Sequence, residues 1–303
     1  MVKQIVKSFA MNLQVSMLFL LSMTISLVNG SASSGAWELV WSDEFNGNTV
    51  NESLWNILNN TSEGNPSTSN QIELYTRNNV FLDGSGHLVL RTKRENVTVQ
   101  GIEFNITSGR VDSSLKANVS FAAGGRLEVS ARLQNDAAYG LHTAHWLVGY
   151  DCWPKGGEID IMECQSPHNA YNGELSGTNQ VVSSNYHYGR ECNNDTRHTT
   201  GTSVWPNAAS PSAGNFTSDF TLFAVEWNST TLQYFVNDTK VNTVWNNMPG
   251  WPESAPAVIP SWDMFLILSQ AYMKHRPYGD PAEWVWNLGV EQLFDYVRVY
   301  KVA

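Results

Sequence analysis

The stretch "WPKGGEIDIMEC", residues 153–164, places three acidic side chains within six positions of an otherwise apolar run. Glu158 and Asp160 are two residues apart, so on a β-strand they point to the same face. Glu163 follows three residues after Asp160, and a regular strand would turn it to the opposite face, among the isoleucines. A strand of regular geometry therefore buries one of these three carboxylates in an apolar environment.

A β-bulge at Ile161–Met162 resolves this conflict, because it adds one residue to the strand and returns Glu163 to the acidic face. A buried, unpaired carboxylate costs several kcal/mol, so the bulge is the less costly arrangement. The sequence predicts a bulged strand whose acids Glu158, Asp160 and Glu163 all open onto one concave cleft.

Three carboxylates on one face repel one another, which raises at least one pKa and allows a general acid to stay protonated near neutral pH. Two neighbouring glutamates are what a retaining glycosidase requires, one as the nucleophile and one as the acid/base. A calcium site and a solvated edge strand are the alternatives. Trp146 and Trp153 flank the acids and favour the enzyme, because aromatic faces stack on sugar rings.

Composition indicates an all-β chain. The 303 residues include 12 tryptophans and 15% charged residues, and the net charge of -10 argues against a nucleic-acid partner. Short β-type runs separated by turn signals predict a sandwich of curved sheets, as one domain over residues 35–303. The clearest of these predicted strands cover residues 86–95, 125–133, 220–228, 232–238, 264–273 and 294–302.

The N-terminus is typical of a secretory signal, expected to be cleaved from residues 1–32. Lys3 and Lys7 precede an apolar stretch, residues 13–28, and small residues follow it. A membrane anchor is the alternative, but the stretch is short and interrupted by polar residues, whereas a span needs about 20 apolar residues. We expect a secreted glycoprotein without membrane association, because Asn-x-Ser/Thr sequons begin at ten positions after residue 50: Asn51, Asn59, Asn60, Asn96, Asn105, Asn118, Asn194, Asn215, Asn228 and Asn237.

The three cysteines, Cys152, Cys164 and Cys192, bracket the acidic stretch. An oxidising compartment favours one disulfide among them, and three pairings are possible. The alternative is that all three are small buried side chains. Their spacing matches no zinc site.

"GGEIDIMEC", residues 156–164, resembles the Glu-x-Asp-x-x-Glu signature of glycoside hydrolase family sixteen, and its spacing resembles the laminarinase-like branch of that family. The likeness extends along most of the chain in the family's order. It includes "LVWSDEFNG" (39–47), "IELYTRNNVFLDGSGHLVLRTKRE" (72–95), "TSGRV" (107–111), "GGRLEVSARL" (124–133), "LHTAHWLVG" (141–149), "FAVEWNSTTLQYFVND" (223–238) and "FDYVRVYKV" (294–302).

This resemblance implies a β-jelly-roll of two curved antiparallel sheets, with a substrate cleft on the concave face, that hydrolyses β-1,3-glucan internally with retention. By the same resemblance, Glu158 is the nucleophile, Glu163 the acid/base and Asp160 the assisting carboxylate. The implied partner is a β-glucan polysaccharide, no cofactor is required for the chemistry, and we expect a monomer.

The resemblance also implies binding residues. Trp146, Trp153 and His187 correspond to side chains of the cleft, although a lone histidine is otherwise an ordinary structural residue. Asn70 and Arg126 resemble polar sugar contacts, and either is equally well a turn residue or a surface cation.

A structural calcium is a further implication of the family. Asp295 fits its ligand position, with backbone partners near Glu44 and Gly86, and hard oxygen ligands suit this ion. An ordinary hydrogen bond of Asp295 is the alternative.

Two stretches depart from the family pattern. "LILSQAYMKHRP" (266–277) has Gln270 where asparagine is usual, in a strand expected to line the cleft. "LHTAHW" (141–146) replaces the more usual "LWPAFW", which places His142 and His145 near the cleft. Both changes leave open a mixed-linkage glucanase or a glucan transglycosylase. A non-catalytic β-1,3-glucan recognition protein is the remaining alternative, but such proteins typically lose one or both catalytic glutamates.

Overall fold

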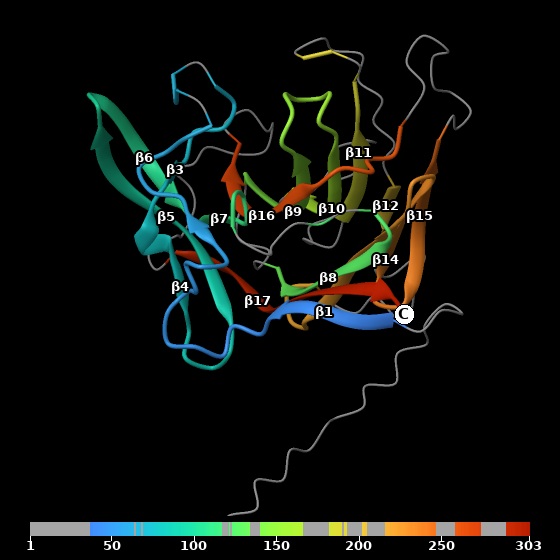
Figure 1. Cartoon of the computed structure of the whole chain (residues 1–303). Helices are drawn as coiled ribbons and strands as arrows, with labels where there is room; N and C mark the ends of the chain where they lie inside the picture. The colour runs from blue at the N-terminus through green and yellow to red at the C-terminus, as the bar shows by residue number, and fades with distance from the viewer. Residues whose placement is uncertain are drawn as a thin grey trace, which may run out of the picture. The chain divides into compact units, whose positions relative to one another are not determined.

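The computed structural model describes residues 37–63, 65–67, 69–116, 121, 123–133, 140–165, 182–189, 191–192, 202–204, 216–246, 258–273 and 289–303 (Figure 1). The chain divides into two compact units, Met1–Ser31 and Ala32–Ala303, and all described residues belong to the second. The predicted signal segment and the sequons at Asn118, Asn194 and Asn215 lie outside the described residues. In the described part of the chain, no helix has the length and apolar character needed to cross a membrane.

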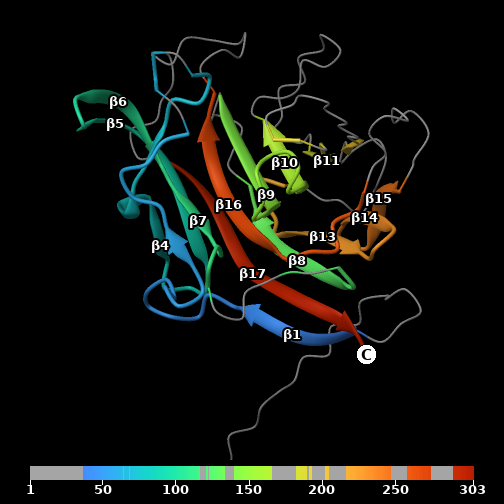
Figure 2. The same ribbon diagram turned by 45° about the horizontal axis from the view of Figure 1, so that its top comes forward.

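The acidic strand lies in the middle of one sheet, which we call the site sheet (Figure 2). Its two neighbours, β9 and β11, directly precede and follow it in the sequence, whereas β16 and β7, on the far side of β9, come from distant parts of the chain. In the described residues its strand order is β12 (Thr202–Val204), β11 (Val182–His187), β10 (Glu158–Gln165), β9 (Leu141–Gly149), β16 (Met264–Tyr272), β7 (Arg110–Asp112) and β2 (Asn56–Ile57).

The second sheet, the backing sheet, contains both ends of the described chain. Its first strand, β1 (Trp37–Asp43), pairs with the last, β17 (Val290–Val302), and β4 (Val80–Leu82) pairs with β5. A 3-10 turn, Arg77–Asn79, precedes β4. The main strand order is β15 (Thr239–Trp245), β14 (Thr231–Val236), β13 (Thr221–Trp227), β8 (Gly125–Arg132), β17, β5 (Leu88–Val99), β6 (Ile102–Ser108) and β3 (Leu74–Tyr75).

The predicted jelly-roll sandwich is confirmed. The described strand pairs are antiparallel apart from the short parallel contact of β3 with β6. The six predicted strands correspond to β5, β8, β13, β14, β16 and β17. Runs rich in β-branched and aromatic residues, each ended by a turn, therefore form strands as expected.

Alternation of side chains places the core between the two sheets. On β8, Leu127, Val129 and Ala131 are fully buried in the core, and the residues between them point away from it. On β10, Ile159 and Ile161 belong to the same core cluster. Burial of a large aliphatic side chain contributes about 1.5–3 kcal/mol, so the apolar face of β10 fixes which side remains for the acids.

The bulge predicted in β10 is confirmed. Asp160 pairs with Asn185 of β11, and Glu163 pairs with Ser183, which is only two residues earlier in β11. The pairing with β9 shifts register at the same place, between Asp160 and Met162. The extra residue returns Glu163 to the face that Glu158 and Asp160 occupy, as the cost of burying a carboxylate requires.

A separate carboxylate, Glu73, is fully buried just before β3. Its Oε2 accepts the backbone N–H of Tyr272 at 2.8 Å. Burial raises the pKa of Glu73 to about 7, and the hydrogen bond from the Tyr272 backbone and the nearby Tyr75 side chain offset only part of that effect. The folded chain therefore binds a proton at Glu73 more tightly than the unfolded chain does.

We expect Glu73→Gln to flatten the pH dependence of stability. The protonated Glu73 side chain contributes to stability fully below pH 4.5, and this contribution is lost as the pH rises through about 7. The reason is that the pKa of Glu73 is higher in the folded chain than in the unfolded chain. From pH 4 to pH 8, the free energy of unfolding of the variant should rise relative to that of wild type by on the order of 3 kcal/mol. Guanidinium unfolding at both pH values measures this, with Glu103→Gln, on the exposed side of β6, as the control. Parallel pH profiles of wild type and Glu73→Gln would contradict the prediction.

Candidate active site

Glu158, Asp160 and Glu163 share the face of the site sheet that points away from the core. On β11, His187 faces the first two of these acids. Its Nε2 lies 3.6 Å from Oε1 of Glu158 and 3.2 Å from Oδ2 of Asp160. The Asp160 residue is only 3% exposed, whereas the Glu158 side chain keeps 16%. The predicted common face of the three acids is therefore confirmed.

Glu163 has its own set of partners. On β9, Nε2 of His142 lies 2.9 Å from Oε1 of Glu163. From the other side, the Asn185 amide of β11 donates a hydrogen bond to Oε2. The neighbouring strands thus hold both carboxylate oxygens of Glu163.

These partners separate the three acids electrostatically. Burial raises the pKa of Glu158 to about 8, the charge of Asp160 adds to the rise, and His187 opposes it. Burial and the charge of Glu163 raise the pKa of Asp160 well above its usual value. Burial also favours a higher pKa for Glu163, but the hydrogen bond and charge of His142, with Asn185 and His187, lower it overall. The expected rise in pKa occurs, but at Glu158 and Asp160 rather than at Glu163.

Aromatic side chains gather around the acids as predicted. The Trp153 side chain lowers the pKa of Glu158, and its ring lies 6.2 Å from that of His187, with 40% of the residue exposed. Trp146 projects from β9, where its Nε1 donates to the hydroxyl of Ser269 at 3.2 Å. The structure therefore brings Trp146, Trp153 and His187 together at one site.

Arg110 on β7 is a site residue that the sequence analysis missed. Its guanidinium lies 5.5 Å from the Trp146 ring centre and 5.7 Å from that of Tyr75, and it forms an ion pair with Glu63. Its position in the sequence could have indicated this role. Arg110 directly precedes Val111, which is fully buried, so strand alternation turns the arginine to the opposite face. The cation fixes the Trp146 ring from the side opposite the acids' strand.

Arg126 is not part of this site. It lies on β8 of the backing sheet, where it pairs with Glu128 at 2.6 Å and Glu226 at 2.7 Å. Its neighbour Leu127 faces the core, so Arg126 points to the outside of the sandwich and away from the site sheet. This position does not support the predicted sugar contact, and Arg126 is instead an ion-paired cation of the backing sheet. Asn70 is exposed in the loop before β3, and the described contacts do not connect it to the acids.

His145 and Gln270 were both expected at the cleft, and the structure places both in the interior instead. His145 is fully buried against Phe294 and lies 2.6 Å from the Gln292 amide, and burial lowers its pKa to about 3. Gln270 is also fully buried, on the core side of β16. Strand alternation explains the position of His145, which is three residues from His142 and therefore on the opposite face of β9.

Asp295 lies at a register shift of β17, and its carboxylate is 3.4 Å from the hydroxyl of Ser130. The Glu44 carboxylate is already bound by Arg298, which leaves only backbone oxygens of that residue for a cation. The calcium site thus stays a prediction. In the described residues, Glu158, Asp160 and His187 have potential ligand atoms within 4.8 Å of one another, a spacing that a cation also fits.

A disulfide joins Cys152 to Cys192, and Cys164 is a buried core residue outside it. The link connects the turn between β9 and β10, which carries Trp153, to the segment after β11. On this turn, the backbone carbonyl of Gly156 accepts the indole N–H of Trp262 at 2.8 Å. The turn before Glu158 is thus held on two sides.

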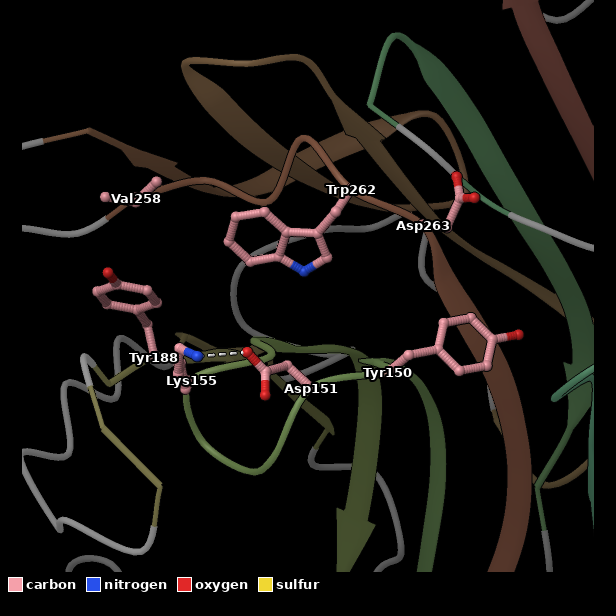
Figure 3. Close-up of a pocket in the computed structure, with 7 residues that line it drawn as sticks. All are labelled: Tyr150, Asp151, Lys155, Tyr188, Val258, Trp262 and Asp263. Atoms are coloured by element: carbon pink, nitrogen blue, oxygen red, sulfur yellow. Dashed lines mark ion pairs between the residues drawn. The ribbon is translucent and has the colours of Figure 1, made fainter.

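Beside this turn lies a pocket of about 610 Å³ (Figure 3). The Trp262 ring faces the ion pair of Lys155 with Asp151, whose atoms are 2.6 Å apart. The remaining lining residues are Tyr150, Tyr188, Val258 and Asp263. None of these residues is one of the three acids, so the pocket adjoins the site without containing it.

A jelly-roll fold with two glutamates on the outer face of one sheet is typical of a glycosidase active site. The chain matches the family "Glycosyl hydrolases family 16" over residues 67–271, more than half of its length. The chain belongs to this family, and its predicted membership is confirmed.

Three known proteins show the extent of similarity. The clotting factor G alpha subunit of Tachypleus tridentatus is 27% identical over 274 residues, which are 88% of this chain but 34% of that protein. The beta-glucanase of Rhodothermus marinus is 28% identical over 315 residues, 93% of either chain. The structure of the endo-beta-1,3-glucanase from Pyrococcus furiosus has a TM-score of 0.70, 23% identity, and coverage of 89% of this chain and 96% of that one. This last likeness shows the common fold.

We expect Cys192→Ser to destabilise the fold without creating a cavity, because Cys192 is exposed. A cross-link between residues 40 apart in the sequence contributes about 4 kcal/mol by restricting the unfolded chain. Guanidinium unfolding of wild type and variant measures the loss. A reductant should lower the stability of wild type to that of the variant and leave the variant unchanged. Equal stability of wild type and Cys192→Ser in the absence of reductant would contradict a Cys152–Cys192 disulfide.

Proposed function

We propose that this chain is a secreted endo-glycosidase that hydrolyses β-1,3-glucan with retention of configuration. The observation that carries the proposal is the pair Glu158 and Glu163 on one face of a bulged strand, each with its own set of partners. Family membership and the beta-glucanase relative support a β-glucan substrate. The apolar N-terminal segment and the sequons support export.

In the first step, a Glu158 carboxylate oxygen attacks the anomeric carbon, and the bond to the leaving glucan oxygen breaks. That oxygen takes a proton from Glu163. In the second step, Glu163 removes a proton from water, the hydroxide oxygen attacks the anomeric carbon, and the bond to Glu158 breaks. Asp160 assists as a buried carboxyl beside the nucleophile, and His187 lies against both.

Trp146 and Trp153 supply aromatic faces for the sugar rings. Both precede the acids along the chain, but they contact different strands: Trp146 on β9 contacts Ser269 of β16, and Trp153, on the turn before β10, lies beside His187 of β11. This arrangement supports binding of several consecutive sugar units and therefore cleavage within a polymer.

The roles of the two glutamates give distinct expected losses. Glu158→Gln should abolish release of reducing ends from laminarin. Glu163→Gln should lose about 10²–10⁴-fold in activity on laminarin, but little in kcat/KM on a dinitrophenyl glycoside, because that ratio reports the first step and this leaving group needs no proton. Reducing-end assays and release of dinitrophenol measure the two effects, with Glu291→Gln on the backing sheet as the control. A wild type that binds laminarin without cleaving it would overturn the enzyme proposal.

Product analysis separates this proposal from the related activities. Laminarin, lichenan and a branched glucan are each incubated with and without an oligosaccharide acceptor. We expect laminarin to be cleaved fastest, without acceptor extension. Preferred cleavage of lichenan would indicate a mixed-linkage glucanase, and acceptor extension a transglycosylase.

We expect the nucleophile to control the acid side of the pH profile. Glu158 must be ionised to attack, and its pKa is raised to about 8, so kcat/KM on the dinitrophenyl substrate should rise with pH through about 8. His187→Gln removes an interaction that lowers the pKa of Glu158, which should move this limb to higher pH. A midpoint that stays in place or falls in His187→Gln would contradict the assignment.

A further inference from the structure

We propose that His142 is the proton partner of Glu163, so that the proton delivered to the leaving group is held by the pair rather than by Glu163 alone. His142 stands in "LHTAHW" (141–146), where the family more usually has another residue. This inference rests on the proposed glycosidase function and assigns a positioning and proton-holding role within it.

The contact is set by the two strands. Ala144 of β9 pairs with Glu163 of β10, and His142 is two residues from Ala144, so its side chain projects beside Glu163 on the same face. Nε2 of His142 lies 2.9 Å from Oε1 of Glu163, and the two side chains keep only 14% and 17% exposure. A proton can therefore move between these atoms along one hydrogen bond, largely away from solvent.

The second partner of Glu163 cannot serve this purpose. Asn185 binds Oε2 through its amide, which donates a hydrogen bond but does not release its proton. A histidine does bind and release a proton between pH 5 and 8. Of the two side chains that hold Glu163, His142 alone offers exchangeable acid/base chemistry.

The surroundings of His142 leave Glu163 as its acidic contact among the described residues. On the β16 side, its register partner is Ala271, followed on the same face by Ser269, and neither titrates. On β11, His187 lies against Glu158 and Asp160 instead. Arg110 of β7 pairs with Glu63 beside Trp146.

His142 and Glu163 act as one acid rather than two independent groups. Burial alone would raise the pKa of Glu163, and the hydrogen bond and charge of His142 are the main causes that lower it. The interaction that favours the ionised form of Glu163 therefore also places a proton donor 2.9 Å from its Oε1.

In the starting state the pair shares one proton, in the hydrogen bond between Nε2 of His142 and Oε1 of Glu163. As the glycosidic bond breaks, its electron pair stays on the leaving oxygen, which takes this proton through Glu163 and leaves a carboxylate beside a neutral imidazole. When water attacks, Glu163 takes its proton, the hydroxide oxygen bonds to the anomeric carbon, the bond to Glu158 breaks, and the pair again shares one proton.

The test compares two aryl β-glycosides of a β-1,3-linked glucose disaccharide. The phenyl glycoside needs a proton on its leaving oxygen, and the dinitrophenyl glycoside does not. We expect His142→Gln and His142→Leu each to lose about tenfold or more in kcat/KM on the phenyl substrate, and less than about twofold on the dinitrophenyl one. Gln retains a hydrogen-bond donor, so it separates proton holding from positioning alone.

A matched control is His87→Gln, because His87 also contacts a carboxylate, Asp83, at 2.7 Å, but in the turn between β4 and β5. It should leave both rates unchanged. Full activity of His142→Gln on both substrates, or equal losses on both substrates in either variant, would overturn the role of His142. A wild type that cleaves neither substrate nor laminarin would instead overturn the proposed function, so the two failures are distinguishable.

Discussion

The cost of placing a carboxylate in an apolar core governs the arrangement of β10 and of the site built on it. One face of this strand is committed to the core by Ile159, Ile161, Met162 and Cys164, all buried. A regular strand would add Glu163 to that face, and the bulge avoids this at the expense of one unpaired position. The surrounding strands complete the core on one face of β10 and supply polar partners for the acids on the other face.

Those polar partners divide three similar side chains into two chemically different groups. Glu158 and Asp160 share His187, in surroundings where burial favours their protonated forms. Glu163 receives donors on both oxygens, which favours its ionised form despite burial. Residue type alone would not distinguish the two glutamates, whereas the hydrogen-bond donors on β9 and β11 do.

The histidines of β9 show how strongly face selection determines chemistry. His142 and His145 are close in sequence, yet one touches Glu163 and the other is packed against Phe294 between the sheets. The buried ring is held neutral by desolvation, while the ring on the site face can exchange protons with a carboxylate. The same alternation sends Gln270 into the core and Ser269 to the indole of Trp146.

The sequence by itself determined the features that depend on one strand: the common face of the three acids, the bulge at Ile161–Met162, and the positions of the six strands predicted from β-type runs. These follow from a side-chain period of two residues and from the cost of burying charge, which act locally. Only the tertiary structure decided which strands became neighbours. Strand order placed Arg126 on the other sheet, brought Arg110 to Trp146, chose Cys192 as the partner of Cys152, and set His142 against Glu163, because such contacts join residues that are distant along the chain.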